Sequence, residues 1–125
     1  MLSNELEMLF KQQIRVSQAG KNKLAISTAM YKTDGTKYEI FLLSKGEKFY
    51  LSDGGATYAE LDKIFEMGEP DVIKNLVVIL KQYGCRKKKN SNAFVMECSP
   101  KDIHVKYGLF VQALSFMLNM KIFYR

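Results

Sequence analysis

Residues 49–61 constrain the fold most, because they join an alternating strand pattern to a double-glycine turn and a helix start. Apolar and polar side chains alternate over 49–52, which is typical of a half-buried strand. The Asp-Gly-Gly sequence at 53–55 follows, and adjacent glycines adopt positive φ at little steric cost. Thr57 and Glu60 then have the spacing of a helix capping box. The stretch therefore predicts a strand that turns sharply into a helix.

Three strands are predicted over residues 24–52. Apolar side chains alternate with others in 24–31, and Asp34-Gly35 is a strong signal for a tight hairpin turn. Residues 37–43 return from that turn, and 48–52 follow a second turn. These segments predict an antiparallel three-strand meander.

Helices are predicted both before and after the meander in the sequence. Apolar residues at helical spacing mark 3–16, 57–66, 70–83 and 101–121, with a turn at 18–22 after the first helix. Pro70 and Gly84 bound the helix at 70–83, and Ser99 is expected to cap the last one.

A second hairpin is predicted over residues 85–98. A two-residue loop at 91–92 would place Cys85 opposite Cys98, near enough to raise the question of a disulfide. A reducing cytosol favours two buried or half-buried thiols instead. The hairpin is expected to extend the meander into one antiparallel sheet with helices packed on it.

Size and composition indicate one globular α+β domain, residues 1–125. Hydrophobic residues make up 47% of the chain and aromatic residues 12%, which is typical of a folded domain and not of a disordered one. No apolar run approaches the roughly 20 residues of a membrane span, and the N-terminus lacks the layout of a secretory signal. A cytoplasmic protein without membrane contact is expected.

The chain is basic, with 19 Lys and Arg against 13 Asp and Glu and a formal net charge of +6. This balance favours nucleic acid or an acidic protein surface as partner. The candidate binding residues form a cluster around the second hairpin: Lys81, Arg86, Lys87, Lys88 and Lys89. Tyr83 and Phe94 lie nearby in sequence and are candidates to stack on bases. The alternative is that charged edge strands prevent aggregation between sheets.

Catalytic constellations are weak. Cys98 and His104 suggest a nucleophile pair, but no orienting partner is identifiable and a surface histidine is the better interpretation. The carboxylates Glu39, Glu47 and Asp53 suggest an atypical metal-dependent nuclease, without the Glu-x-Lys pair of such enzymes. The cysteine and histidine spacings exclude the common zinc sites. No cofactor or metal is expected.

The turn formed by Asp53, Gly54 and Gly55 has two interpretations. Its backbone N–H groups could cradle a phosphate at the start of the following helix. No Walker lysine or dinucleotide fingerprint accompanies it, and a glycine pair before a helix is usually structural.

Several of these stretches resemble a known family. They are residues 38–42, 49–57 with Leu61, 71–83 and 120–124. Together they are similar to the bacterial and phage family labelled domain of unknown function 1828, over roughly residues 5–125. The resemblance implies a small cytosolic protein carried by bacteria, prophages or mobile elements, and it carries over no catalytic residue.

Three functions follow as hypotheses. The leading one is a non-enzymatic binding protein encoded by a phage or mobile element, an inhibitor of a host defence complex such as a CRISPR effector. Its partner would be a protein or ribonucleoprotein complex, contacted through the basic hairpin. The alternatives are direct binding of DNA or RNA and, third, the metal-dependent nuclease. Oligomeric state is not indicated by the sequence.

Overall fold

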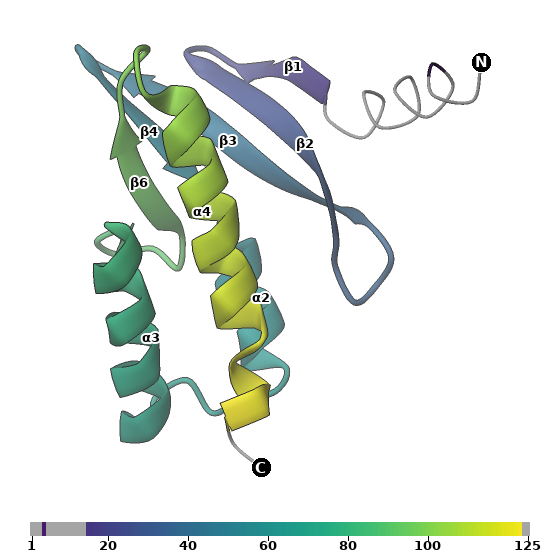
Figure 1. The fold of residues 1–125 in the computed structure, drawn as a ribbon, viewed down its shortest axis with the longest axis vertical. Coiled ribbons are helices and arrows are strands. Elements are labelled where there is room, and N and C mark those ends of the chain that lie inside the picture. The colour runs from purple at the N-terminus through teal and green to yellow at the C-terminus, as the bar shows by residue number, and fades with distance from the viewer. Residues whose placement is uncertain (1–3, 5–14, 124–125) are drawn as a thin grey trace.

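The computed structural model describes Asn4 and residues 15–123 (Figure 1). Its strands are β1 (Arg15–Gly20), β2 (Lys23–Tyr31), β3 (Lys37–Lys45), β4 (Lys48–Ser52), β5 (Arg86–Lys87) and β6 (Phe94–Cys98). Its helices are α2 (Ala56–Asp62), α3 (Pro70–Tyr83), α4 (Ile103–Leu118) and the short 3₁₀ helix η1 (Met120–Phe123). Among the described residues the strands form one antiparallel sheet in the order β1-β2-β3-β4-β6-β5. The predicted α+β class with an antiparallel sheet is confirmed.

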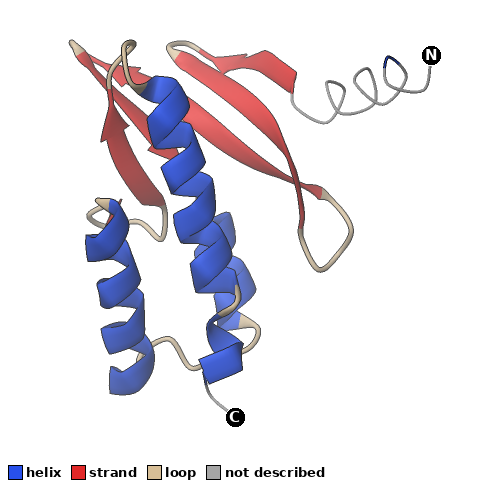
Figure 2. Cartoon of the chain, in the orientation of Figure 1, coloured by secondary structure: helices blue, strands red, loops and turns tan. Residues whose placement is uncertain are grey.

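The helices lie together on one face of the sheet (Figure 2). α4 contacts α2, α3 and β6, so it is the centre of the helical layer. Because strand side chains alternate between faces, Leu51 of β4 and its ladder partner Met96 of β6 both point toward these helices. Both are buried in the same core as Phe110 of α4. This face holds the hydrophobic core.

The other face of the sheet is not covered by any of the described helices. The alternation places Lys23, Leu43 and Tyr50 on it, since these three are consecutive ladder partners across β2, β3 and β4. None of them belongs to the hydrophobic core, and each is half-buried. We call this the open face.

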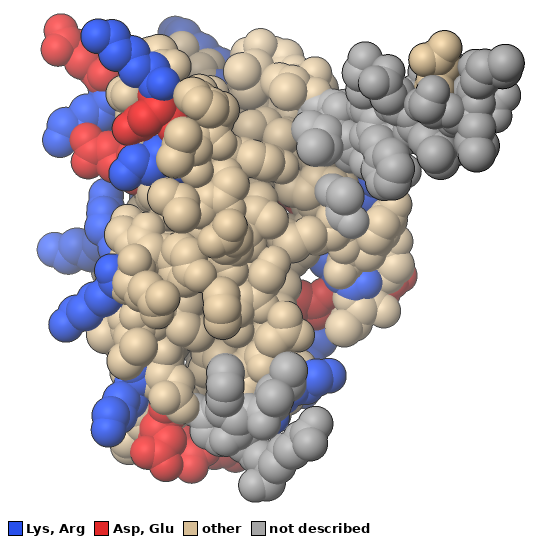
Figure 3. Space-filling view, viewed as in Figure 1, with Lys and Arg blue, Asp and Glu red and all other residues tan. Residues whose placement is uncertain are grey.

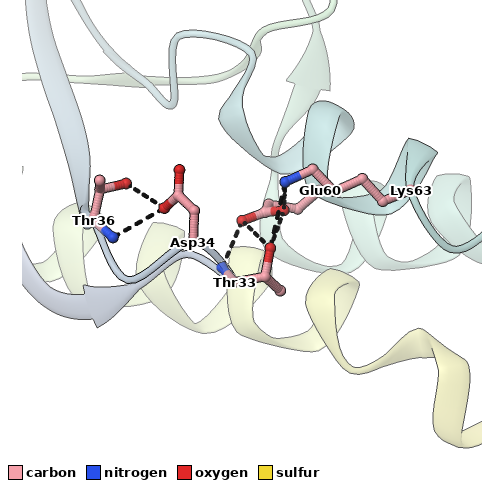
Figure 4. A network of polar contacts seen from close by, with 5 residues as sticks. All are labelled: Thr33, Asp34, Thr36, Glu60 and Lys63. Carbon is pink, nitrogen blue, oxygen red and sulfur yellow. Dashed lines mark hydrogen bonds and ion pairs between the residues drawn. The ribbon is translucent and has the colours of Figure 1, made fainter.

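The loop between β2 and β3 is fastened to α2 by a buried carboxylate (Figure 4). Glu60 accepts a hydrogen bond of 2.9 Å from the backbone N–H of Thr33 and forms an ion pair of 2.8 Å with Lys63. The predicted capping box is therefore wrong: Glu60 reaches another part of the chain, and the N-cap of α2 is Gly55. Thr57 lies inside α2, where its hydroxyl is hydrogen-bonded to the hydroxyl of the buried Tyr38.

The N-terminal prediction needs correction where it can be compared. Of the helix predicted over 3–16, residues 3 and 5–14 lie outside the described residues, but Arg15 and Val16 belong to β1. The predicted turn at 18–22 is also too long, because Gln18 is still paired with Leu24 of β2. Pairing with β2 determines the strand conformation of residues 15–20, and local helical periodicity does not.

The second hairpin forms, but its predicted register is wrong. Arg86 is opposite Val95 and Lys87 is opposite Phe94, so the loop spans 88–93 and not only 91–92. Asn90 adopts φ 60° within that loop. Cys98 is consequently opposite Phe49 of β4 and not opposite Cys85. Both cysteines are buried free thiols.

The helix boundaries follow their local signals to different degrees. α3 matches the predicted 70–83, with Pro70 in its first turn and Gly84 at φ 71° after its end. α2 and α4 are shorter than predicted. Ser99 does not cap α4: Asp102 is the N-cap, and it accepts a 2.7 Å hydrogen bond from the Ser99 N–H. Within the described part of the chain, no helix has the length and apolar character needed to span a membrane.

Candidate functional site

A basic groove lies on the open face of the sheet. It has a volume of about 470 Å³, and its lining includes the cationic residues Lys21, Lys23, Lys45, Arg86, Lys88 and Lys89. Its remaining described lining is Asn22, Leu43, Ser44, Tyr50 and Val95. No carboxylate is among these lining residues. Six positive charges around one cavity create a positive potential that favours an anionic ligand over a cationic one.

Three segments distant in sequence bring these cations together. The β1–β2 turn supplies Lys21, the start of β2 supplies Lys23, and the end of β3 supplies Lys45. Arg86 comes from β5, and the loop after β5 supplies the last two lysines. The β1–β2 turn is held beside β3 by a hydrogen bond of 3.0 Å from the Ser44 N–H to the Asn22 carbonyl. The groove is thus a product of sheet topology.

Two aromatic rings on the open face each have a cation above them. The guanidinium carbon of Arg86 lies 5.9 Å from the ring centroid of Tyr50, and Lys23 Nζ lies 4.3 Å from that of Phe41. Both distances fall within the range of cation–π attraction. The contacts hold the two cations against the sheet surface, whereas Lys21, Lys88 and Lys89 lie in turns or loops and Lys45 is the last residue of β3.

One carboxylate on the open face lies beside the groove without lining it. Glu97 is the ladder partner of Tyr50 and forms an ion pair of 3.8 Å with Lys48. Both side chains of that pair are more than half exposed. The negative charge of Glu97 therefore has its own partner outside the groove.

The predicted basic cluster is divided by the structure. Arg86, Lys88 and Lys89 line the groove, whereas Lys81 and Lys87 do not. Lys87 is exposed on the opposite side of β5 from Arg86, because adjacent residues of a strand point to opposite faces.

Sequence reasoning missed the other half of the groove. Lys21, Lys23 and Lys45 occur singly in the sequence and were not part of the predicted cluster. The usable signal was the predicted meander itself, since pairing of its first two strands brings the start of β2 beside the end of β3.

The aromatic residues expected to stack on bases are not on this face. Phe94 is fully buried in the core, so that prediction is wrong. Tyr83 packs in the helical layer, with its ring centroid 5.9 Å from that of Phe116. Phe41 and Tyr50 lie on the open face instead.

The Asp-Gly-Gly turn uses its polar groups within the chain. The Asp53 carboxylate is 1% exposed and accepts hydrogen bonds from the N–H groups of Gly55, Thr57 and Phe94 at 2.9, 3.2 and 2.9 Å. The Gly54 N–H donates to Ser52 Oγ at 3.1 Å. These contacts make the turn a structural corner that ties β4, α2 and β6 together.

The remaining candidates for catalysis do not assemble. No group of three metal-ligating side chains is close enough to hold a metal ion among the described residues, and Glu39 and Glu47 are exposed. Burial raises the pKa of Cys85 to about 12 and also raises the pKa of Cys98. Both thiols are therefore protonated near neutral pH and poor nucleophiles. His104 is exposed.

Comparisons with known proteins add no relative: no family model, no curated protein and no solved structure matches this chain.

Proposed function

We propose that this chain is a non-enzymatic binding protein that holds DNA or RNA, free or within a ribonucleoprotein complex, in the basic groove. The observation that carries the proposal is the set of six cationic side chains around one cavity whose described lining has no carboxylate. Phosphate groups are the abundant anions that such a surface binds.

The physical basis is the release of counterions from the nucleic acid. Each phosphate neutralised by a lysine or arginine frees condensed cations, so the affinity falls as salt rises. The alternative explanation, protection of edge strands against aggregation, applies to β1 and β5. It does not account for Lys23 and Lys45, which belong to the inner strands β2 and β3.

The biological context is a further part of the proposal and rests on the family resemblance. A protein carried by a phage or mobile element could block a defence complex such as a CRISPR effector by occupying its nucleic acid. In a reconstituted cleavage assay of such an effector, the wild-type protein should then inhibit, and a variant without the groove charges should not.

The direct test compares two triple variants of equal charge. One replaces Lys21, Lys45 and Arg86 in the groove by Ser, and the control replaces Lys81, Lys87 and Lys101 outside it. All six side chains are exposed, and each triple lowers the formal net charge from +6 to +3, since 6 − 3 = 3. Affinity for a labelled oligonucleotide is measured by fluorescence anisotropy over a range of salt concentrations.

The groove variant should bind more weakly, and the slope of log affinity against log salt should fall in magnitude by about 2 for a single strand. The control should keep most of the wild-type slope. Equal losses in the two variants would mean that only net charge matters and that the groove is not the site. Absence of binding by the wild type at about 50 mM salt would refute nucleic-acid binding.

A further inference from the structure

We infer that the groove takes an unpaired stretch of nucleic acid and that one base stacks on the floor formed by Tyr50, beside the guanidinium of Arg86. The inference rests on the proposed function and adds the class of ligand: a single strand of DNA or RNA, not a duplex.

The floor of the groove is apolar and partly aromatic. Leu43 and Tyr50 are ladder partners on β3 and β4, and both line the cavity. Val95 of β6 lines it as well but is only 4% exposed, so the part of this floor that solvent reaches is formed by the half-buried Leu43 and Tyr50. A ligand that offered only phosphates would contact the lysines and leave this floor in water. A planar base covers it and removes apolar surface from water.

Arg86 completes a stacking site. It is opposite Val95 in the ladder, and its guanidinium carbon lies 5.9 Å from the Tyr50 ring centroid. A guanidinium is planar and weakly hydrated, and it stacks on aromatic faces and on bases. The side chain can thus contact a base with its plane and a phosphate with its N–H groups.

The cations are placed on both sides of this floor. Lys21 and Lys23 lie at the β1–β2 end of the sheet, on one side of β3 and β4. Lys88 and Lys89 lie in the loop after β5, at the other edge of the sheet. A single strand of nucleic acid that crosses the sheet between these two groups of lysines would keep its phosphates near them while one of its bases lies on Tyr50. We therefore expect the nucleic-acid strand to run roughly perpendicular to β3 and β4.

A duplex does not fit this arrangement. Its bases are paired and stacked inside the helix, and reaching the floor would require a base to be flipped out at an energetic cost. The volume of about 470 Å³ lies within the range of roughly 300–1,000 Å³ typical of sites for small ligands. Such a site accommodates a unit of the size of a nucleotide.

The test uses four probes against the unmodified protein: a single strand of about ten nucleotides, within the site sizes of small single-strand-binding domains, its duplex, an abasic strand of equal length, and a mononucleotide. DNA and RNA versions of the strand are compared. The single strand should bind about tenfold more tightly than the abasic strand, because stacking adds to phosphate contacts. It should also bind more tightly than the duplex and the mononucleotide.

Variants locate the base. Tyr50→Leu keeps an apolar side chain and should remove most of the tenfold advantage over the abasic strand, whereas Tyr50→Phe should retain it. Tyr83→Leu, in the helical layer, is the matched control and should change neither the affinity for the normal strand nor the affinity for the abasic strand. Thermal melts verify that each variant is folded.

The outcomes separate this inference from the proposed function. Equal affinity for normal and abasic strands, with strong salt dependence, would overturn base stacking and leave phosphate binding intact. Tighter binding of the duplex, or of the mononucleotide, would overturn the single-strand inference in the same way. No binding of any probe at about 50 mM salt would overturn both.

Discussion

The two faces of the sheet use the same strands for different purposes. Leu51 and Met96 point into the helical layer and are buried with Phe110. Tyr50, next to Leu51 in the chain, lies on the open face and lines the basic groove. Side chains that alternate along one strand thus divide the hydrophobic core from the proposed binding surface, and a residue's surroundings depend on its face more than on its sequence neighbours.

The outer surfaces of the two layers also differ in charge. Figure 3 views the molecule from the helical side, where the central surface over α4 is largely uncharged and the lysines lie toward the edges. α4 carries few ionisable side chains between Ile103 and Leu118. The groove on the open face concentrates six cations. Stability should therefore depend on the helical side, and nucleic-acid affinity on the open side.

The largest expected change in the free energy of unfolding comes from replacing one aromatic residue on each side of the sheet. Phe110→Ala removes a fully buried ring and should lower the free energy of unfolding by about 3–5 kcal/mol. Tyr50→Leu replaces a half-buried ring by another apolar side chain and should cost about 1 kcal/mol or less. Urea denaturation measures both. Equal losses would show that Tyr50 belongs to the core.

The next effect tests the corner between the layers. Asp53→Ala leaves three buried or half-buried N–H groups without their acceptor and should lower the free energy of unfolding by about 3 kcal/mol. Asp34 is the matched control, because its carboxylate also accepts within a glycine turn, from the Thr36 N–H at 2.9 Å, but it is exposed. Asp34→Ala should cost about 0.5 kcal/mol. A small loss at Asp53 would contradict its structural role.

A smaller effect tests how closely the corner approaches the open face. Gly54 has φ 65°, and an added Cβ would lie 2.9 Å from Phe41 Cε2. Gly35 has φ 89° with no atom within 4 Å of such a Cβ. Gly35→Ala should cost about 1 kcal/mol from backbone strain alone, and Gly54→Ala about 2 kcal/mol. Equal losses in thermal unfolding would mean that Phe41 moves aside freely.

The smallest effect concerns pH and the loop fastened to α2. The pKa of Glu60 is held below its ordinary value of 4.5, first by the hydrogen bond from Lys63 and then by those from Thr33. A depressed pKa stabilises the fold above 4.5, and this stabilisation is lost as the pH falls through the folded-state value. Glu60→Gln should therefore cost about 1 kcal/mol at pH 7 and progressively less as the pH falls through the folded-state pKa. A loss that stays constant with pH, in urea titrations, would contradict this explanation.

Local signals in the sequence predicted the parts of the fold that local chemistry determines. α3 was predicted correctly, because Pro70 and Gly84 act on the backbone where they stand. The register of the second hairpin was not, because Asn90 extends its loop and the pairing of β6 with β4 fixes the strand from outside. Helical periodicity extended the predicted first helix to Val16, but Val16 pairs with Ile26 of β2, a contact that the local pattern does not reveal.

The candidate site was half predictable for the same reason. Arg86, Lys88 and Lys89 form a visible run in the sequence, whereas Lys21 and Lys45 join them only through sheet pairing. Phe94 was placed near the cations by sequence distance, but alternation points it into the core.

Nucleic acid is proposed to bind the open face and not the helical face. The most direct measurement is a titration of ¹⁵N-labelled protein with a single-stranded oligonucleotide, followed by amide chemical shifts. We expect the shift changes to concentrate at 21–23, 43–45 and 86–89, with the amides of α3 and the centre of α4 unchanged. Changes concentrated on α3 and α4, with the groove amides unaffected, would contradict it.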